Sequence, residues 1–111
     1  MLSEATVKLR VDDERIIATA EGNGPVNALD TALRKALSPK FPALASLELA
    51  DFKVRILAGT HGTGATTRVL VETADGVGRE WTTVGVDRNV VEASWQALVD
   101  SLTYGLERTG R

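Results

Sequence analysis

The alternation of hydrophobic and polar residues along the chain predicts five strands. It is cleanest in residues 4–12 (EATVKLRVD), where every second residue is apolar, as in a strand with one buried face. Residues 15–21 (RIIATAE) follow a turn of acidic residues and are rich in β-formers, so we expect them to return as a hairpin partner. Three further strands are predicted at residues 47–57, 67–75 and 79–86.

Apolar residues at helical spacing predict two helices, one after the second strand and one after the last. The first begins at Pro25, with the preceding glycine or asparagine as its N-cap, and ends before Pro39. The second begins after Asn89, which stands three residues before a glutamate as in a capping box. Residues 40–46 (KFPALAS) are predicted to form a connection over the surface. The apolar stripes are Val26, Leu29, Leu33 and Leu37, and then Val91, Trp95, Leu98, Leu102 and Leu106.

The two predicted helices are related by an internal repeat. A shift of 65 residues lays Val26, Ala28, Ala32, Leu33 and Leu37 onto Val91, Ala93, Ala97, Leu98 and Leu102. Because each helix follows a hairpin, we predict a single α+β domain, residues 1–111, of two β-β-(β)-α units with a sheet packed on two helices. The units are residues 4–45 and 46–109. The first lacks a counterpart of the strand at 47–57, so we expect its opening strand to be missing and the chain to begin inside a larger protein.

One predicted strand carries apolar residues on both faces, with Val69 and Val71 on one side and Leu70 on the other. An apolar sheet face that nothing covers usually marks a partner surface. A second copy of the same chain is the commonest partner, and we therefore predict a homodimer.

Composition narrows the class of protein. With 43% hydrophobic and 25% charged residues and no long apolar run, the 111-residue chain is typical of a globular domain and shows no membrane segment. A net charge of -2 with scattered basic residues argues against nucleic acid as a partner, although a small α+β nucleic-acid binder stays an alternative. The chain lacks cysteine and a signal peptide, so we expect a cytoplasmic location.

Signs of catalysis or of a cofactor are weak. The one histidine, His61, has no neighbouring ligand types that would form a metal site, so we expect no metal and no cofactor. Its loop, residues 59–67 (GTHGTGATT), lacks the lysine of a phosphate-binding loop and precedes a strand instead of a helix. Trp95 lies on an apolar stripe and is assigned to the core, which leaves Trp81 less certain.

The turn EGNGP, at residues 21–25, is the strongest candidate site. Amides at the start of a helix carry a partial positive charge that suits a carboxylate, and apolar residues nearby would suit an aliphatic side chain. A free branched-chain amino acid offers both groups. A purely structural glycine-asparagine turn is the alternative that these residues leave open.

Four stretches carry a resemblance to a known family. They are GNGPVNALDTAL at 22–33, LADFKVRIL at 49–57, GTGATTRVLVE at 62–72 and REWTTVGVDRNVVEASWQALVDSL at 79–102. Together they resemble the C-terminal regulatory domain of the 2-isopropylmalate synthase and citramalate synthase family. Trp81 and Trp95 make the chain more similar to the citramalate synthase branch. The resemblance covers nearly the whole chain.

The resemblance implies a non-catalytic, homodimeric domain that binds an end-product amino acid, isoleucine before leucine, for feedback inhibition. It also implies an N-terminal partner domain, an acetyl-CoA-dependent catalytic barrel, which we expect to lie outside this chain. The effector pocket implied by the motifs comprises Gly22, Asn23, Gly24, Pro25, Val26, Leu49, Phe52, Ile56, Val86 and Asp87. Phe52 replaces a tyrosine frequent in the family and lacks its phenol. The alternative is a structural dimerisation module without an effector.

Overall fold

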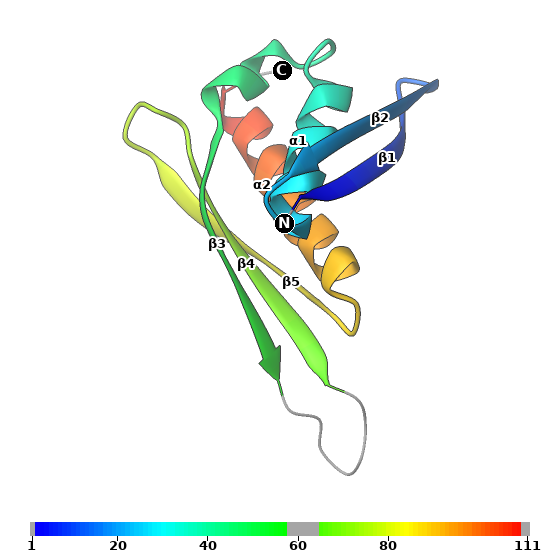
Figure 1. Ribbon diagram of the computed structural model, residues 1–111. Coiled ribbons are helices and arrows are strands. Elements are labelled where there is room, and N and C mark those ends of the chain that lie inside the picture. The colour runs from blue at the N-terminus through cyan, green and yellow to red at the C-terminus, as the bar shows by residue number, and fades with distance from the viewer. Residues whose placement is uncertain (1, 58–64, 110–111) are drawn as a thin grey trace.

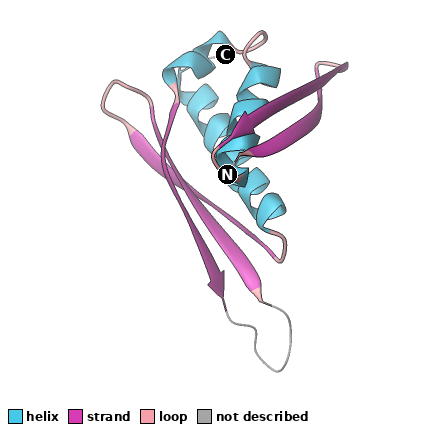
Figure 2. Ribbon diagram, viewed as in Figure 1, coloured by secondary structure: helices cyan, strands magenta, loops and turns pink. Residues whose placement is uncertain are grey.

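The part of the chain that the structure describes forms an α+β fold of five strands and two α-helices, drawn as a ribbon in Figure 1. The computed structural model describes residues 2–57 and 65–109. Figure 2 shows the same view coloured by secondary structure. In chain order the elements are β1 (Ser3–Val11), β2 (Glu14–Gly22), α1 (Pro25–Leu37), the 3-10 helix η1 (Pro42–Ser46), β3 (Glu48–Leu57), β4 (Thr66–Ala74), β5 (Glu80–Asp87) and α2 (Val90–Thr109). No helix within these described ranges is long and apolar enough to cross a membrane.

The strands form two antiparallel sheets, whereas the sequence predicts one sheet packed on two helices. The first sheet is the hairpin β1-β2, and the second has the order β3-β4-β5. Each sheet packs against the helix that follows it, and α1 and α2 pack against each other. The helices therefore lie in the middle of the structure, and the hairpins do not join edge to edge in the described part of the chain.

The β1-β2 hairpin closes with a two-residue turn. Asp12 and Asp13 both have positive φ, at 50° and 65°, as the favoured two-residue hairpin turn requires. Aspartate tolerates this left-handed region better than most residues do. The acidic stretch after the first predicted strand thus sets the register, in which Val7 lies opposite Ala18 with both side chains in the core.

The internal repeat is visible in the packing. Ala28, Ala32 and Leu33 of α1 are buried, and so are their counterparts Ala93, Ala97 and Leu98 of α2. One glycine in each unit lets the strand approach its helix. A Cβ at Gly22 would lie 2.6 Å from the Ala28 nitrogen, and a Cβ at Gly85 would lie 1.8 Å from the Ala93 oxygen. Val91 departs from its predicted stripe, because it lies 51% exposed in the first turn of α2.

The connection between the units is only partly at the surface, because two apolar side chains of residues 40–46 are buried whereas Pro42, Ala45 and Ser46 are exposed as predicted. Phe41, Leu44 and Leu47 all belong to the hydrophobic core. Room for Leu47 comes from α2, where a Cβ at Gly105 would lie 2.5 Å from Leu47 Cδ1 and 2.9 Å from Trp81 Cζ2. The glycine inside this helix therefore fits the close approach of η1.

Candidate functional site

The turn between β2 and α1 has the open backbone that its sequence predicts. Gly24 adopts a φ of 102°, which disfavours any residue with a side chain. Its amide donates to the Gly22 carbonyl at 3.0 Å, and Pro25 then occupies the start of α1. Asn23 lies between the two glycines, and its carbonyl accepts a hydrogen bond from the side chain of Asn27 at 3.2 Å.

The two helices differ at their N-termini. Among the described residues, no side chain caps α1, whose N-cap residue is Gly24. At the counterpart position in α2, the Asn89 side-chain oxygen accepts from the amides of Val91 at 2.7 Å and Glu92 at 3.3 Å. Asp87 in turn accepts from the Asn89 amide at 2.9 Å. An incoming carboxylate would therefore compete with a bound side chain at α2, but with no such side chain at α1.

The apolar residues predicted for the pocket lie mainly on one face of the second sheet. Phe52 and Ile56 pair with Val71 and Thr67 on the face of β4 that α2 covers. Phe52 is half-buried there, whereas Ile56 lies at the far end of β3 and is 71% exposed. Val86 lies on the opposite face of the sheet and is therefore separated from these residues.

A polar pocket of about 470 Å³ lies between α1 and the start of β3. Of the predicted residues it includes Leu49, but not the turn at 22–26 or the other two residues of β3. The predicted site residues thus do not line one common pocket in the described chain. The lining residues are Asn27, Asp30, Arg34, Ser38, Leu44, Ala45, Leu47, Glu48 and Leu49.

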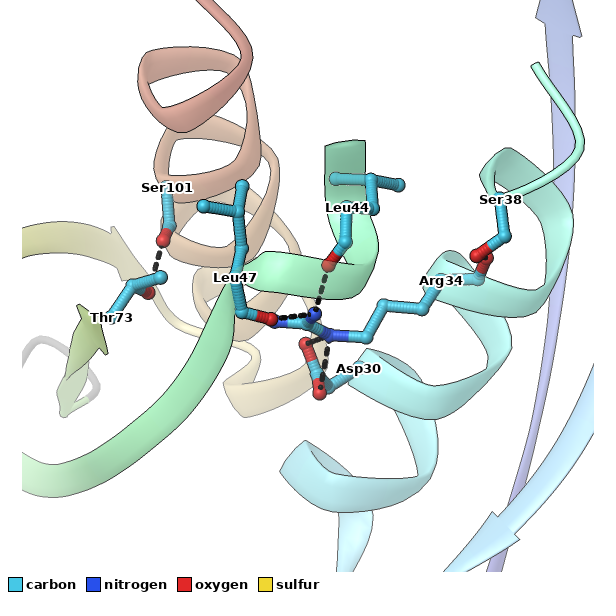
Figure 3. Close-up of polar contacts among 7 residues, drawn as sticks. All are labelled: Asp30, Arg34, Ser38, Leu44, Leu47, Thr73 and Ser101. Carbon is cyan, nitrogen blue, oxygen red and sulfur yellow. Dashed lines mark hydrogen bonds and ion pairs between the residues drawn. The ribbon is translucent and has the colours of Figure 1, made fainter. Parts of the chain in front are cut away.

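Asp30 and Arg34 both line this pocket and form an ion pair, which Figure 3 shows. The Arg34 Nε donates to both carboxylate oxygens of Asp30 at 3.0 Å, and its Nη1 donates to the backbone oxygens of Leu44 and Leu47. The side chain of Asp30 is only 10% exposed, and that of Arg34 is 21% exposed. Sequence reasoning missed this cluster, although an aspartate four residues before an arginine on one helix face is a recognisable signal.

Other candidates from the sequence occupy structural positions. The Trp81 indole donates to the Ser101 carbonyl at 3.1 Å, and Trp95 packs against the core as predicted. His61 lies outside the described residues. Within the described ranges, no group of three or more histidine, cysteine or acidic residues is placed to hold a metal ion. A larger apolar pocket, of about 550 Å³, contains none of the predicted site residues.

Comparison with known proteins identifies one family model. Residues 1–106 match the model described as LeuA allosteric (dimerisation) domain. The match covers both units of the chain.

Curated relatives are synthases of two kinds. The chain is 66% identical over 108 residues to an (R)-citramalate synthase of Streptomyces coelicolor. This alignment covers 97% of the chain and 20% of that protein. It is 58% identical over 102 residues to an (R)-citramalate synthase of Synechocystis sp., covering 92% and 18%. A 2-isopropylmalate synthase of Methanocaldococcus jannaschii is 32% identical over 102 residues, again covering 92% and 18%. The chain thus spans about a fifth of the length of these relatives.

Proposed function

We infer that this chain, which belongs to the LeuA allosteric (dimerisation) domain family, is a non-catalytic regulatory domain that binds a branched-chain amino acid. In this proposal it feedback-inhibits a citramalate synthase or 2-isopropylmalate synthase. The higher identity to citramalate synthases favours that branch and isoleucine as the effector. The chemical step would belong to a catalytic domain outside these residues, in a cytoplasmic enzyme.

The observation that carries the proposal is the uncapped start of α1. A turn at Gly22–Pro25 that presents helix-end amides without a side-chain acceptor suits the carboxylate of an amino acid. Family membership makes an effector the expected occupant. The inner face of β3 carries apolar groups that suit the aliphatic side chain, with Phe52 half-buried and Ile56 exposed. The proposal requires that the turn and this face be brought together, because they line no common pocket in the described chain.

The proposed domain acts as a homodimer. An effector that binds two arrangements of the dimer with different affinity shifts the population between them, and a connected catalytic domain would respond to that shift. Residues 1–111 would then serve as one regulatory domain, with its two units at 4–45 and 46–109.

Calorimetry with isoleucine, leucine and valine tests effector binding directly. We expect heat of binding for the 111-residue chain and a loss of affinity of about fivefold to thirtyfold for Ile56→Ala, because roughly 1 to 2 kcal/mol of apolar contact is removed. Ile17→Ala is the matched control, since Ile17 is also exposed, at 55%, but lies on β2 outside the proposed pocket. A folded chain that gives no heat with any of the three amino acids would refute the effector role.

A structural dimerisation module is the second candidate function. The family description names dimerisation as well as allostery, and both glycines of the turn have structural reasons to be there. This candidate predicts a stable dimer whose melting temperature does not change at millimolar isoleucine. The effector proposal instead predicts a rise, because a ligand that binds only the folded state stabilises it.

A further inference from the structure

Like charges face each other across β3 and β4. Arg55 lies directly opposite Arg68, and Asp51 lies directly opposite Glu72. Like charges at directly opposed positions destabilise a sheet. Both pairs lie on the outer face, the face turned away from α2, because the alternate residues of β4 between them are buried beneath that helix. The outer face comprises Asp51, Lys53, Arg55, Arg68, Leu70, Glu72, Thr82, Val84 and Val86.

The centre of the outer face is apolar. Leu70 of β4 lies between Lys53 of β3 and Val84 of β5, and these three residues form one row across the sheet. The next row contains Arg55, Arg68 and Val86. Both valines are 47% exposed. In that same row, the Arg68 Nε is buried from solvent and has no hydrogen-bond partner among the described residues. A buried guanidinium nitrogen without an acceptor is costly in free energy. The outer face of a single chain therefore contains a polar group that lacks a hydrogen bond among the described residues.

We propose that two copies of this chain pack outer face to outer face, with their strands antiparallel. The inference rests on the dimerisation part of the proposed function and specifies its interface. The two-fold axis lies midway between the two sheets and runs perpendicular to the strands. It passes over the row formed by Lys53, Leu70 and Val84. A second copy is the occupant because the charge pattern is complementary to itself, which a two-fold dimer requires.

The register of β3 and β4 determines the contacts across this axis. The acidic pair and the basic pair lie two residues to either side of the axial row. A two-fold rotation reverses the strand direction and therefore places Asp51 over the partner's Arg55 and Glu72 over the partner's Arg68. Packed sheets lie about 10 Å apart, a gap that long acidic and basic side chains span.

The two states differ in how these charges are satisfied. A single chain places like charges opposite each other, whereas the dimer gives each of them an opposite charge. Leu70 and the exposed valines are covered in the same step, which adds apolar burial. Lys53 lies on the axial row and therefore faces the Lys53 of the second copy. Because β3 is an edge strand, the long side chain of each lysine can keep its ammonium in water.

Charge exchange tests the interface. The acidic-face variant is Arg55→Glu with Arg68→Glu, and the basic-face variant is Asp51→Arg with Glu72→Arg. Sedimentation equilibrium of each variant alone should show dimerisation weakened by about a hundredfold or more, because like charges meet across the axis. An equimolar mixture of the two should form a heterodimer. Lys8→Glu with Arg10→Glu, on exposed positions of β1, is the matched control and should dimerise as the wild type does.

A chain with all four substitutions separates the interface from a folding defect. It restores complementarity and should dimerise again, whereas misfolding would persist. If the wild type and both charge variants dimerise equally, the outer face is not the interface, although the dimer of the proposed function stands. If the folded wild type stays monomeric, both the interface and the dimer are refuted. Calorimetry reports the effector part separately.

Discussion

Asp75 shapes the turn between β4 and β5 through its carboxylate. One oxygen accepts the amides of Val77 at 2.9 Å and Arg79 at 3.0 Å, and the other accepts the Arg79 Nε at 2.9 Å. The side chain is only 1% exposed. Hydrogen bonds to the carboxylate lower the pKa of Asp75 from its ordinary value of 3.8. The Val77 amide has the largest effect, and the Arg79 amide and guanidinium add to it.

A lowered pKa in the folded state predicts a pH-dependent contribution to stability. This contribution is complete above the unfolded-state pKa and is lost as the pH falls through the folded-state pKa. We therefore expect Asp75→Asn to be less stable than the wild type at about pH 7, with the difference shrinking below about pH 4. Urea denaturation across this range measures it, with the exposed Asp100→Asn as the control. A deficit that is the same at every pH would contradict the assignment.

Arg34 joins two segments, because its guanidinium connects Asp30 of α1 to the carbonyls of Leu44 in η1 and of Leu47 just after it. Arg34→Met should destabilise the fold by about 2 to 3 kcal/mol, since the Asp30 carboxylate would lose its hydrogen-bonded partner and two carbonyls would lose a donor. Lys40→Met is the matched control, because the Lys40–Glu14 pair spans 3.5 Å and the glutamate is 64% exposed. That change should cost less than about 1 kcal/mol. Equal losses in urea denaturation would contradict the difference between the two pairs.

The elements could be predicted largely from local pattern. Alternation and helical spacing place the strands and α1 within a few residues, because each depends on neighbours in sequence. The path of residues 40–46 could not be predicted in this way, because prolines and small residues are typical of a linker. The burial of Leu47, which follows them, depends on Gly105, which lies far along the chain in α2 and leaves space for its side chain. The Arg34 contact to η1 depends on the same tertiary packing.

At the scale of the whole molecule, the repeat was predictable but its assembly was not. A common offset related the two helices, and both bury the same alanine and leucine positions. The division into two sheets depends on long-range pairing, which periodicity does not encode. The candidate site shows the same limit. Its turn follows from Gly24 and Pro25, whereas the separation of Val86 from Ile56 follows from strand register.

The strand β3 links the two proposals, because its inner face carries Phe52 and Ile56 and its outer face carries Asp51 and Arg55. Packing of the outer face against a second copy should restrain this strand and preorganise its inner face for an effector. Isoleucine should therefore tighten the dimer, within the fivefold to 150-fold range that is typical of about 1 to 3 kcal/mol of coupling.

Reciprocity makes this coupling testable from both sides. The monomeric acidic-face variant should bind isoleucine more weakly than the wild-type dimer, by the same factor per site that isoleucine contributes to dimerisation. Sedimentation equilibrium with and without isoleucine gives one factor, and calorimetry on the variant gives the other. Alanine is the control ligand, since it has the same charged groups but too small a side chain to reach the apolar residues. Equal isoleucine affinity in monomer and dimer would show that β3 does not couple its two faces.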